Sequence, residues 1–206
     1  KDFKNLQNKK IWCAVSTHDD EELFCSRVQG IIKKTFRESS CIIIPRHVNR
    51  TKEIYLTLSR LGFKIQIKNE NESIDSSAEI VLINYYGAVN LFLQRIKNVF
   101  IGKSLIKKMI KVGGQSPIEA AKMGCYVFHG PYVSNFREIY SYLKNKGFSE
   151  EINHPEELAK KLIKNFNNDK KVVDKEKLKE LEVYSNSIFM NLISDYKVLI
   201  NENFKA

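Results

Sequence analysis

The sequence predicts an α/β protein in which a Rossmann-like, doubly wound parallel sheet is followed by a long C-terminal helix. Short apolar segments alternate with segments of helical periodicity, which is typical of βαβ units and of a parallel sheet covered on both faces. The last part of the chain has helical periodicity throughout. We therefore expect a Rossmann-like domain in residues 1–150 and a helical extension that packs on it in residues 151–206.

The expected strands are short apolar runs that end at polar or turn residues. Such runs are rich in Ile, Val, Phe and Cys, as buried parallel strands are. Ligands of parallel α/β sheets bind beyond the carboxyl ends of the strands, so the loops that follow these runs matter most for function. The strands are expected in residues 10–16, 41–44, 63–67, 79–83, 99–101 and 125–128.

The expected helices carry recognisable start and stop signals. Asp19 and Glu22 have the spacing of a capping box, and Gly62 is a typical residue just past a helix end. Ser116 and Glu119 repeat the capping-box spacing around Pro117. The helices are expected in residues 19–36, 52–61, 89–96, 117–123, 133–144, 155–166 and 174–203.

Composition narrows the functional classes. The 206 residues are 43% hydrophobic, which excludes a disordered chain, and no run reaches the roughly 18 apolar residues of a membrane span. The four cysteines are scattered, so buried reduced thiols of a cytoplasmic protein are expected, and no His or Cys cluster predicts a metal site. The net charge of +10 indicates anionic partners. Interleaved aromatic and basic motifs are absent, so nucleic-acid binding ranks last.

A glycine-rich segment is the strongest local motif. Gly113 and Gly114 precede Gln115, Ser116 and Glu119 at a predicted helix start. Two glycines permit a sharp turn and close backbone approach, and the first amides of a helix can bind a phosphate. The residues alone leave two interpretations about equally open: a phosphate-binding turn, or a well-capped helix after a tight turn.

Three further loops hold candidate ligand-binding side chains. Arg46 follows the predicted second strand, where its guanidinium can clamp a phosphate or carboxylate, although a surface arginine paired with Glu53 is the alternative. Its neighbour His47 taken alone is more often structural. His18 precedes a run of four acidic residues, which we interpret as decoration of a helix N-terminus rather than as a metal site. Asn135 lies in a loop that is either ligand-binding or an ordinary turn.

These motifs, in this order, resemble the Kdo (3-deoxy-D-manno-octulosonic acid) transferase family of GT-B glycosyltransferases. The resemblance runs from Trp12 to about Ile139. It rests on five segments, W-C-A-V-S-T-H-D-D-E-E from Trp12, P-R-H-V-N-R from Pro45, F-I-G-K-S-L from Phe100, G-G-Q-S-P-I-E-A-A from Gly113 and G-P-Y-V-S-N-F from Gly130. Five motifs in the correct order are far more specific than any one of them.

The resemblance implies the C-terminal, donor-binding half of a transferase that moves Kdo from CMP-Kdo to a lipid A precursor in lipopolysaccharide biosynthesis. It implies that an N-terminal domain outside this chain grips the lipid and holds the catalytic carboxylate. It also implies that the full-length protein associates with the cytoplasmic face of the bacterial inner membrane. No cofactor and no metal are expected. The expected donor-binding residues are Arg46, His47, Gly113, Gly114, Gln115, Ser116, Glu119 and Asn135, with Ser16, His18 and Ser104 as secondary candidates.

The chain departs from the family pattern at three positions. Ala88 stands where the family usually has an acidic residue, Lys103 replaces the second glycine of F-x-G-G-S-L, and Ser116 replaces an asparagine that it can match as a helix cap. Two alternatives therefore stay open beside the Kdo transferase. One is another GT-B enzyme, such as one that uses a UDP-sugar, and the other is a degenerate, non-catalytic module that binds a nucleotide or a partner protein.

Overall fold

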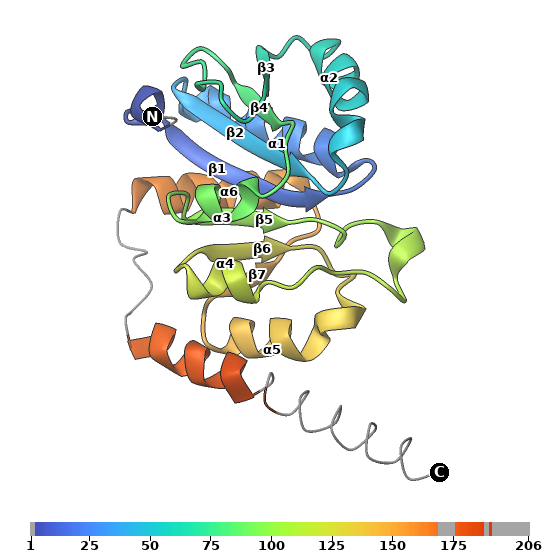
Figure 1. Ribbon diagram of the computed structural model, residues 1–206, viewed down its shortest axis with the longest axis vertical. Helices are drawn as coiled ribbons and strands as arrows, with labels where there is room; N and C mark the ends of the chain where they lie inside the picture. The colour runs from blue at the N-terminus through green and yellow to red at the C-terminus, as the bar shows by residue number, and fades with distance from the viewer. Residues whose placement is uncertain (1–2, 169–175, 188–189, 191–206) are drawn as a thin grey trace. The chain divides into compact units, whose positions relative to one another are not determined.

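The computed structural model describes residues 3–168, 176–187 and 190, and it divides the chain into compact units at Lys1–Val172 and Val173–Ala206. In the described residues the first unit holds a sheet of seven parallel strands in the order β3-β4-β2-β1-β5-β6-β7 (Figure 1). The strands are β1 Lys10–Thr17, β2 Ser39–Pro45, β3 Ile65–Lys68, β4 Ile80–Ile83, β5 Asn98–Ile101, β6 Tyr126–His129 and β7 Ser149–Glu151.

Helices cover both faces of this sheet. The helices of the first unit are α1 Glu21–Thr35, α2 Thr51–Ser59, α3 Ala88–Leu93, α4 Ile118–Lys122, α5 Arg137–Asn145 and α6 Pro155–Asn167. Alternate residues of β1 point to opposite faces: Cys13 and Val15 join the core under α3, α4 and α5, whereas Trp12 and Ala14 join the core under α1, α2 and α6 (Figure 1). The predicted doubly wound α/β fold is confirmed.

The structure adds an edge strand that the sequence does not predict. β7 has only three residues, Ser-Glu-Glu, and pairs with Val127–His129 of β6. A short polar segment lacks the apolar alternation by which strands are recognised, and edge strands are commonly short and charged. The neighbouring helix α6 packs against α1, so the first compact unit continues beyond residue 150, where the helical extension was expected to begin.

The helix starts differ from the predicted capping boxes. Helix α1 begins at Glu21 after Asp20, which has a left-handed backbone with φ of 70°, and no side chain caps it. The capping box of Asp19 and Glu22 is therefore wrong, because the side chains of both residues contact Arg50 instead. Helix α4 has only five residues, and the hydroxyl group of Ser116 lies 3.5 Å from the amide of Ile118, at the limit of a hydrogen bond.

All four cysteines are buried free thiols, as expected. Burial raises the pKa of each thiol, in the case of Cys125 to about 11. In the second unit, residues 176–187 and 190 are helical, and the rest of the helix expected in residues 174–203 lies outside the described residues. No described helix combines the length and the apolar character needed to cross a membrane.

Candidate functional site

The topology of the sheet predicts where a ligand binds. β1 pairs with β2 on one side and with β5 on the other, so the chain changes direction across the sheet between β1 and β5. Loops that leave the two strands at this switch point diverge to opposite faces and leave a crevice at the carboxyl edge. A cavity of about 330 Å³ lies at this position and is lined by the ends of both strands, Val15, Ser16 and Ile101.

Helices α3 and α4 both contribute to the wall of the cavity. Val89 and Leu93 of α3 give it an apolar side, and Ala120 of α4 contributes to the lining. The polar lining is supplied by residues that the sequence places in two distant motifs, namely Ser16, Gln115, Ser116 and Glu119. The fold thus brings four predicted site residues to one cavity, and the side chains of Ser116 and Glu119 are exposed to solvent there.

Glu21 joins the two loops that border the cavity. One oxygen of its carboxylate accepts hydrogen bonds from the amides of His18, at 2.9 Å, and Lys103, at 2.7 Å. The other oxygen accepts from the amides of Ser104, at 2.9 Å, and Leu105, at 3.0 Å. The side chain is buried; burial raises the pKa of Glu21, and the four N–H donors oppose this shift.

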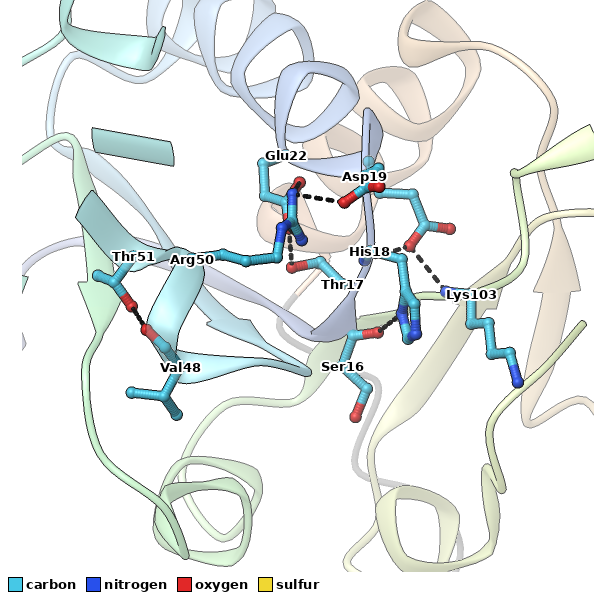
Figure 2. A network of polar contacts seen from close by, with 10 residues as sticks. Ser16, Thr17, His18, Asp19, Glu22, Val48, Arg50, Thr51 and Lys103 are labelled. Atoms are coloured by element: carbon cyan, nitrogen blue, oxygen red, sulfur yellow. Dashed lines mark hydrogen bonds and ion pairs between the residues drawn. The ribbon is translucent and has the colours of Figure 1, made fainter. Parts of the chain in front are cut away.

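A second buried carboxylate holds the loop that follows β2. Glu22 accepts a hydrogen bond from the Thr17 hydroxyl group at 2.8 Å and pairs with the guanidinium group of Arg50 at 3.1 Å (Figure 2). Arg50 also pairs with Asp19 at 2.9 Å (Figure 2). Burial raises the pKa of Glu22, whereas Thr17 and Arg50 lower it. Glu21 and Glu22 thus lie in the first turn of α1, as expected for acids at a helix N-terminus, but both are buried and hold neighbouring loops.

Two histidines meet at the ends of β1 and β2. The rings of His18 and His47 are 5.8 Å apart between centroids and nearly perpendicular. The Nδ1 atom of His18 lies 3.0 Å from the carbonyl oxygen of Ser16, which identifies it as the protonated ring nitrogen (Figure 2). Burial lowers the pKa of His18, and the neighbouring His47 and Lys103 lower it further. The hydrogen bond to Ser16 and the charge of Glu22 oppose this shift. In the neutral ring the Nε2 atom is a hydrogen-bond acceptor.

Arg46 lies next to this pair but contacts no carboxylate in the part of the chain that is described. Its amide donates to the carbonyl oxygen of Thr17 at 3.0 Å, which ties the end of β2 to the end of β1. Its side chain is exposed, as is that of His47. The described contacts include no ion pair between Arg46 and Glu53. The guanidinium group of Arg46 is therefore free to bind an anion.

The glycines of the predicted phosphate-binding turn have a packing role. A Cβ atom on Gly113 would lie 2.2 Å from the Tyr132 carbonyl oxygen, and one on Gly114, whose φ is 94°, would lie 3.1 Å from the Cα atom of Val133. Both glycines are buried, and the Asn135 side chain donates to the carbonyl oxygen of Val112 at 3.0 Å. These contacts fasten the segment before α4 to the loop after β6. The residues of this segment that line the cavity are Gln115 and Ser116.

Ser104 is also structural. Its hydroxyl group donates to the carbonyl oxygen of Ile101 at 2.7 Å and accepts from the amide of Gly130 at 2.8 Å, and the residue is fully buried. It joins the ends of β5 and β6. The secondary candidates therefore separate into Ser16, which lines the cavity, His18, which lies beside it, and Ser104, which has no exposed atom to offer a ligand.

Comparisons with known proteins agree with the motifs on which this site is built. No protein-family model matches the chain. The 3-deoxy-D-manno-octulosonic acid transferase of Rickettsia conorii is 28% identical over 159 residues, which is 77% of this chain and 33% of that protein. The relative of Aquifex aeolicus with the same name is 24% identical over 82% of this chain and 45% of its own length. The chain thus spans a third to a half of the length of these relatives.

Among solved structures, the C-terminal CMP-Kdo binding domain of WaaA from Acinetobacter baumannii matches with a TM-score of 0.74 and 19% identity. The match covers 86% of this chain and 89% of that domain. The chain is thus similar in sequence to Kdo transferases and in fold to the C-terminal CMP-Kdo binding domain of WaaA. Its fold is that of a GT-B C-terminal domain, and the C-terminal domain of a glycosyl transferase group 1 family protein from Francisella tularensis is also similar, with a TM-score of 0.53.

Two departures from the Kdo transferase pattern lie near cavity-lining residues in the chain, Ala88 next to Val89 and Lys103 two residues after Ile101. Ala88 is the first residue of α3, is buried, and follows Gly87, whose φ is 82°. Lys103 keeps a left-handed backbone, with φ of 58°, although it carries a side chain. Its carbonyl oxygen accepts from the amide of Gly114 at 2.7 Å, so it joins the loop after β5 to the segment before α4.

Sequence reasoning missed the residues that hold the loops together. Glu21 and Gly102 are the main examples: a Cβ atom on Gly102 would lie 2.5 Å from the Ser16 carbonyl oxygen and 2.7 Å from the Glu21 carboxylate. Both residues lie inside motifs that are recognisable in the sequence. Their membership of these motifs was the only sign that they are important. The amides of Lys103 and Ser104, which bind Glu21, lie more than 80 residues further along the chain, so no local pattern reveals these contacts.

Proposed function

We propose that this chain is the donor-binding half of a glycosyltransferase that transfers Kdo from CMP-Kdo to a lipid A precursor. The observation that carries the proposal is the cavity at the switch point between β1 and β5, lined by Ser16, Gln115, Ser116 and Glu119. These residues come from two of the five motifs that the chain shares with the Kdo transferases. A nucleoside fits such a crevice, with its polar groups meeting hydroxyl, amide and carboxylate groups.

In this proposal Glu119 accepts hydrogen bonds from the ribose hydroxyl groups, because its carboxylate is an exposed acceptor on the cavity wall. Arg46 and His47 lie toward the phosphate, where a guanidinium group can form charge-assisted hydrogen bonds. Side-chain charge then neutralises the departing CMP without a metal or other cofactor. Gly113, Gly114 and Asn135 act indirectly, since they hold Gln115 and Ser116 in place.

The acceptor and the catalytic base belong to the other half of the enzyme in this proposal. Glu21 and Glu22 are buried and already hydrogen-bonded, and Asp19 is paired with Arg50. None of these three carboxylates is available to deprotonate an acceptor hydroxyl group. We propose that an N-terminal domain outside this chain supplies that base, grips the lipid, and brings the protein to the cytoplasmic face of the bacterial inner membrane.

Titration of the chain with CMP, UMP, UDP and ADP tests the identity of the donor. We expect CMP to bind best, with a dissociation constant on the order of 0.1–1 mM in the open half-site. A clear preference for UDP would replace the Kdo transferase with another nucleotide-sugar enzyme. Binding of no nucleotide at all would indicate a non-catalytic module instead.

Two neighbouring arginines provide a matched mutational test. Arg46→Ala removes a free guanidinium group, so CMP affinity should fall by about 10–100-fold, the equivalent of roughly 1.5–3 kcal/mol, while thermal stability stays unchanged. Arg50→Ala breaks the buried pair with Glu22 and the exposed pair with Asp19, so it should lower the melting temperature and weaken CMP binding less. Isothermal titration and thermal melting of both variants distinguish these roles. Wild-type CMP affinity in Arg46→Ala would contradict the phosphate assignment.

A further inference from the structure

Basic side chains or histidines follow the carboxyl ends of three adjacent strands. β2 is followed by Arg46 and His47, β1 by His18, and β5 by Gly102 and then Lys103. β2, β1 and β5 are neighbours in the parallel sheet, so their carboxyl ends lie side by side. Strands in a sheet are roughly 4.8 Å apart, so the arc from Arg46 to Lys103 spans on the order of 10 Å at its base.

The backbone of Lys103 is held in a conformation that suits glycine. Its φ is 58°, its amide donates to the Glu21 carboxylate at 2.7 Å, and its carbonyl oxygen accepts from the Gly114 amide at 2.7 Å. A Cβ atom makes the left-handed region unfavourable, and glycine is the residue that normally occupies it. Backbone strain of this kind persists mainly where a side chain has a use.

The acids near the arc have other partners, apart from the exposed Asp20. Glu21 is occupied by four backbone amides, and Glu22 and Asp19 are paired with Arg50. Within the described part of the chain, no ion pair involves Lys103 or Arg46. In the view of Figure 2 the side chains of Lys103 and Ser16 run to the same side of the strand end, away from the Arg50 cluster.

The neutral ring of His18 lies between the two cations along the sheet. The Nδ1 atom of His18 is held by the carbonyl oxygen of Ser16, and Ser16 also lines the cavity. Its Nε2 atom can accept a hydrogen bond from a hydroxyl group. Two cations that flank a hydroxyl acceptor match a ligand in which an oxyanion lies close to hydroxyl groups, as in an acidic sugar or a sugar phosphate.

We propose that Lys103 completes an oxyanion subsite with Arg46 and His18 beside the nucleoside cavity and thereby selects donors that carry an acidic group there. The proposal rests on the proposed function, because it adds a specificity-determining residue to the same donor site. The group that this subsite would bind is a singly charged oxyanion. Its two sources are the phosphate of the nucleotide and the carboxylate of a 2-keto sugar acid.

Four variants of the chain test this role. Lys103→Arg keeps the charge, Lys103→Asn removes it in a residue that tolerates a left-handed backbone, and Lys103→Gly removes the side chain and the strain. Lys107→Asn removes a charge from an exposed lysine of the same loop as a control. NMR titrations compare CMP with cytidine for the phosphate, and Kdo with its methyl ester for the carboxylate.

We expect Lys103→Asn and Lys103→Gly to weaken binding of CMP, of Kdo, or of both by about 10-fold, as for the loss of one charge-assisted contact. Cytidine and the methyl ester should bind all variants equally, and Lys103→Arg and Lys107→Asn should behave as wild type. A loss for CMP alone identifies the phosphate, and a loss for Kdo alone identifies the carboxylate. The melting temperature of Lys103→Gly should equal or exceed that of the wild type, which separates lost binding from lost folding.

Unchanged CMP and Kdo affinities in both neutral variants, with wild-type binding intact, would overturn the role of Lys103 and leave the proposed function standing. A chain that prefers another nucleotide would overturn the proposed donor. The same comparison of nucleotide with nucleoside in the Lys103 variants would then decide the role of Lys103. A wild-type chain that binds neither nucleotide nor sugar acid would overturn both.

Discussion

At the scale of single residues, the site depends on carboxylates that never meet solvent. Glu21 accepts hydrogen bonds from four backbone amides that belong to the loops after β1 and β5. Each of these donors would cost free energy if it were left buried and unpaired. Glu22 plays the corresponding part between Thr17 and Arg50. The acids thus position the cavity wall and leave the cations at its rim unpaired.

Replacement of Glu21 tests this role at the same scale. Glu21→Gln keeps the shape of the side chain, but its amide nitrogen faces N–H donors and leaves two of them without an acceptor. We expect the free energy of unfolding to fall by about 2–3 kcal/mol, as measured by urea denaturation. Glu53→Gln, at an exposed position of α2, is the control and should change stability by less than about 0.5 kcal/mol. Equal stability of the two variants would argue against the proposed clamp.

At the scale of elements, loops approach one another closely enough to exclude side chains. Gly102, Gly113 and Gly130 each lie against the backbone of another loop, and a Cβ atom on any of them would come within 2.5 Å of a backbone oxygen. Gly102 follows β5, Gly113 precedes α4, and Gly130 follows β6. The carboxyl edge of the sheet is therefore one packed layer of loops, and the motif glycines serve that packing.

Two glycine substitutions should have opposite effects. Gly102→Ala would place a Cβ atom 2.5 Å from the Ser16 carbonyl oxygen, so we expect destabilisation by about 1–3 kcal/mol. Gly30→Ala lies in the interior of α1, where the nearest atom to a Cβ is Cζ of Phe63 at 3.5 Å, so the better helix former should stabilise by about 0.5–1 kcal/mol. Thermal melting of both variants is the measurement. A stabilised Gly102→Ala would disprove the close approach of the loops.

At the scale of the whole molecule, the proposed donor site is exposed at one edge of the sheet. The chain spans 33% of its Rickettsia conorii relative and 45% of its Aquifex aeolicus relative. Its cavity opens at the carboxyl edge of the sheet, where Arg46, His47 and Glu119 are exposed. Charge interactions of exposed groups are screened by water and salt, which limits the affinity that this half can reach alone.

We expect this chain alone to transfer no Kdo. The reason is that Glu21 and Glu22 are buried, Asp19 is paired with Arg50, and we assign the exposed Glu119 to the ribose. A radiolabelled transfer assay with freshly generated CMP-Kdo and a lipid A precursor measures this directly. Addition of a matching N-terminal half from a relative should restore activity. Transfer by the chain alone above a no-enzyme control would place the catalytic base within these residues.

The sequence by itself determined the fold class and the family resemblance. Apolar runs such as Cys41–Ile44 and the helical periodicity between them are local properties, and they are sufficient to predict βαβ units because burial of each run depends on its own residues. The five motifs likewise identify the Kdo transferase resemblance from residues that are close in the chain. The prediction that Ser16 and the Gln115–Glu119 segment belong to one site came from motif order rather than from geometry.

Only the tertiary structure decided how those motifs meet. The order of strands in a sheet depends on which edges pair, and this places β5 beside β1 although more than 80 residues separate Val15 from Ile101. That pairing creates the cavity, gives Glu21 its distant amides, and aligns Arg46, His18 and Lys103 in one arc. Local patterns could not reveal these contacts, because hydrogen bonds and packing between distant segments depend on geometry that arises only when the sheet has formed.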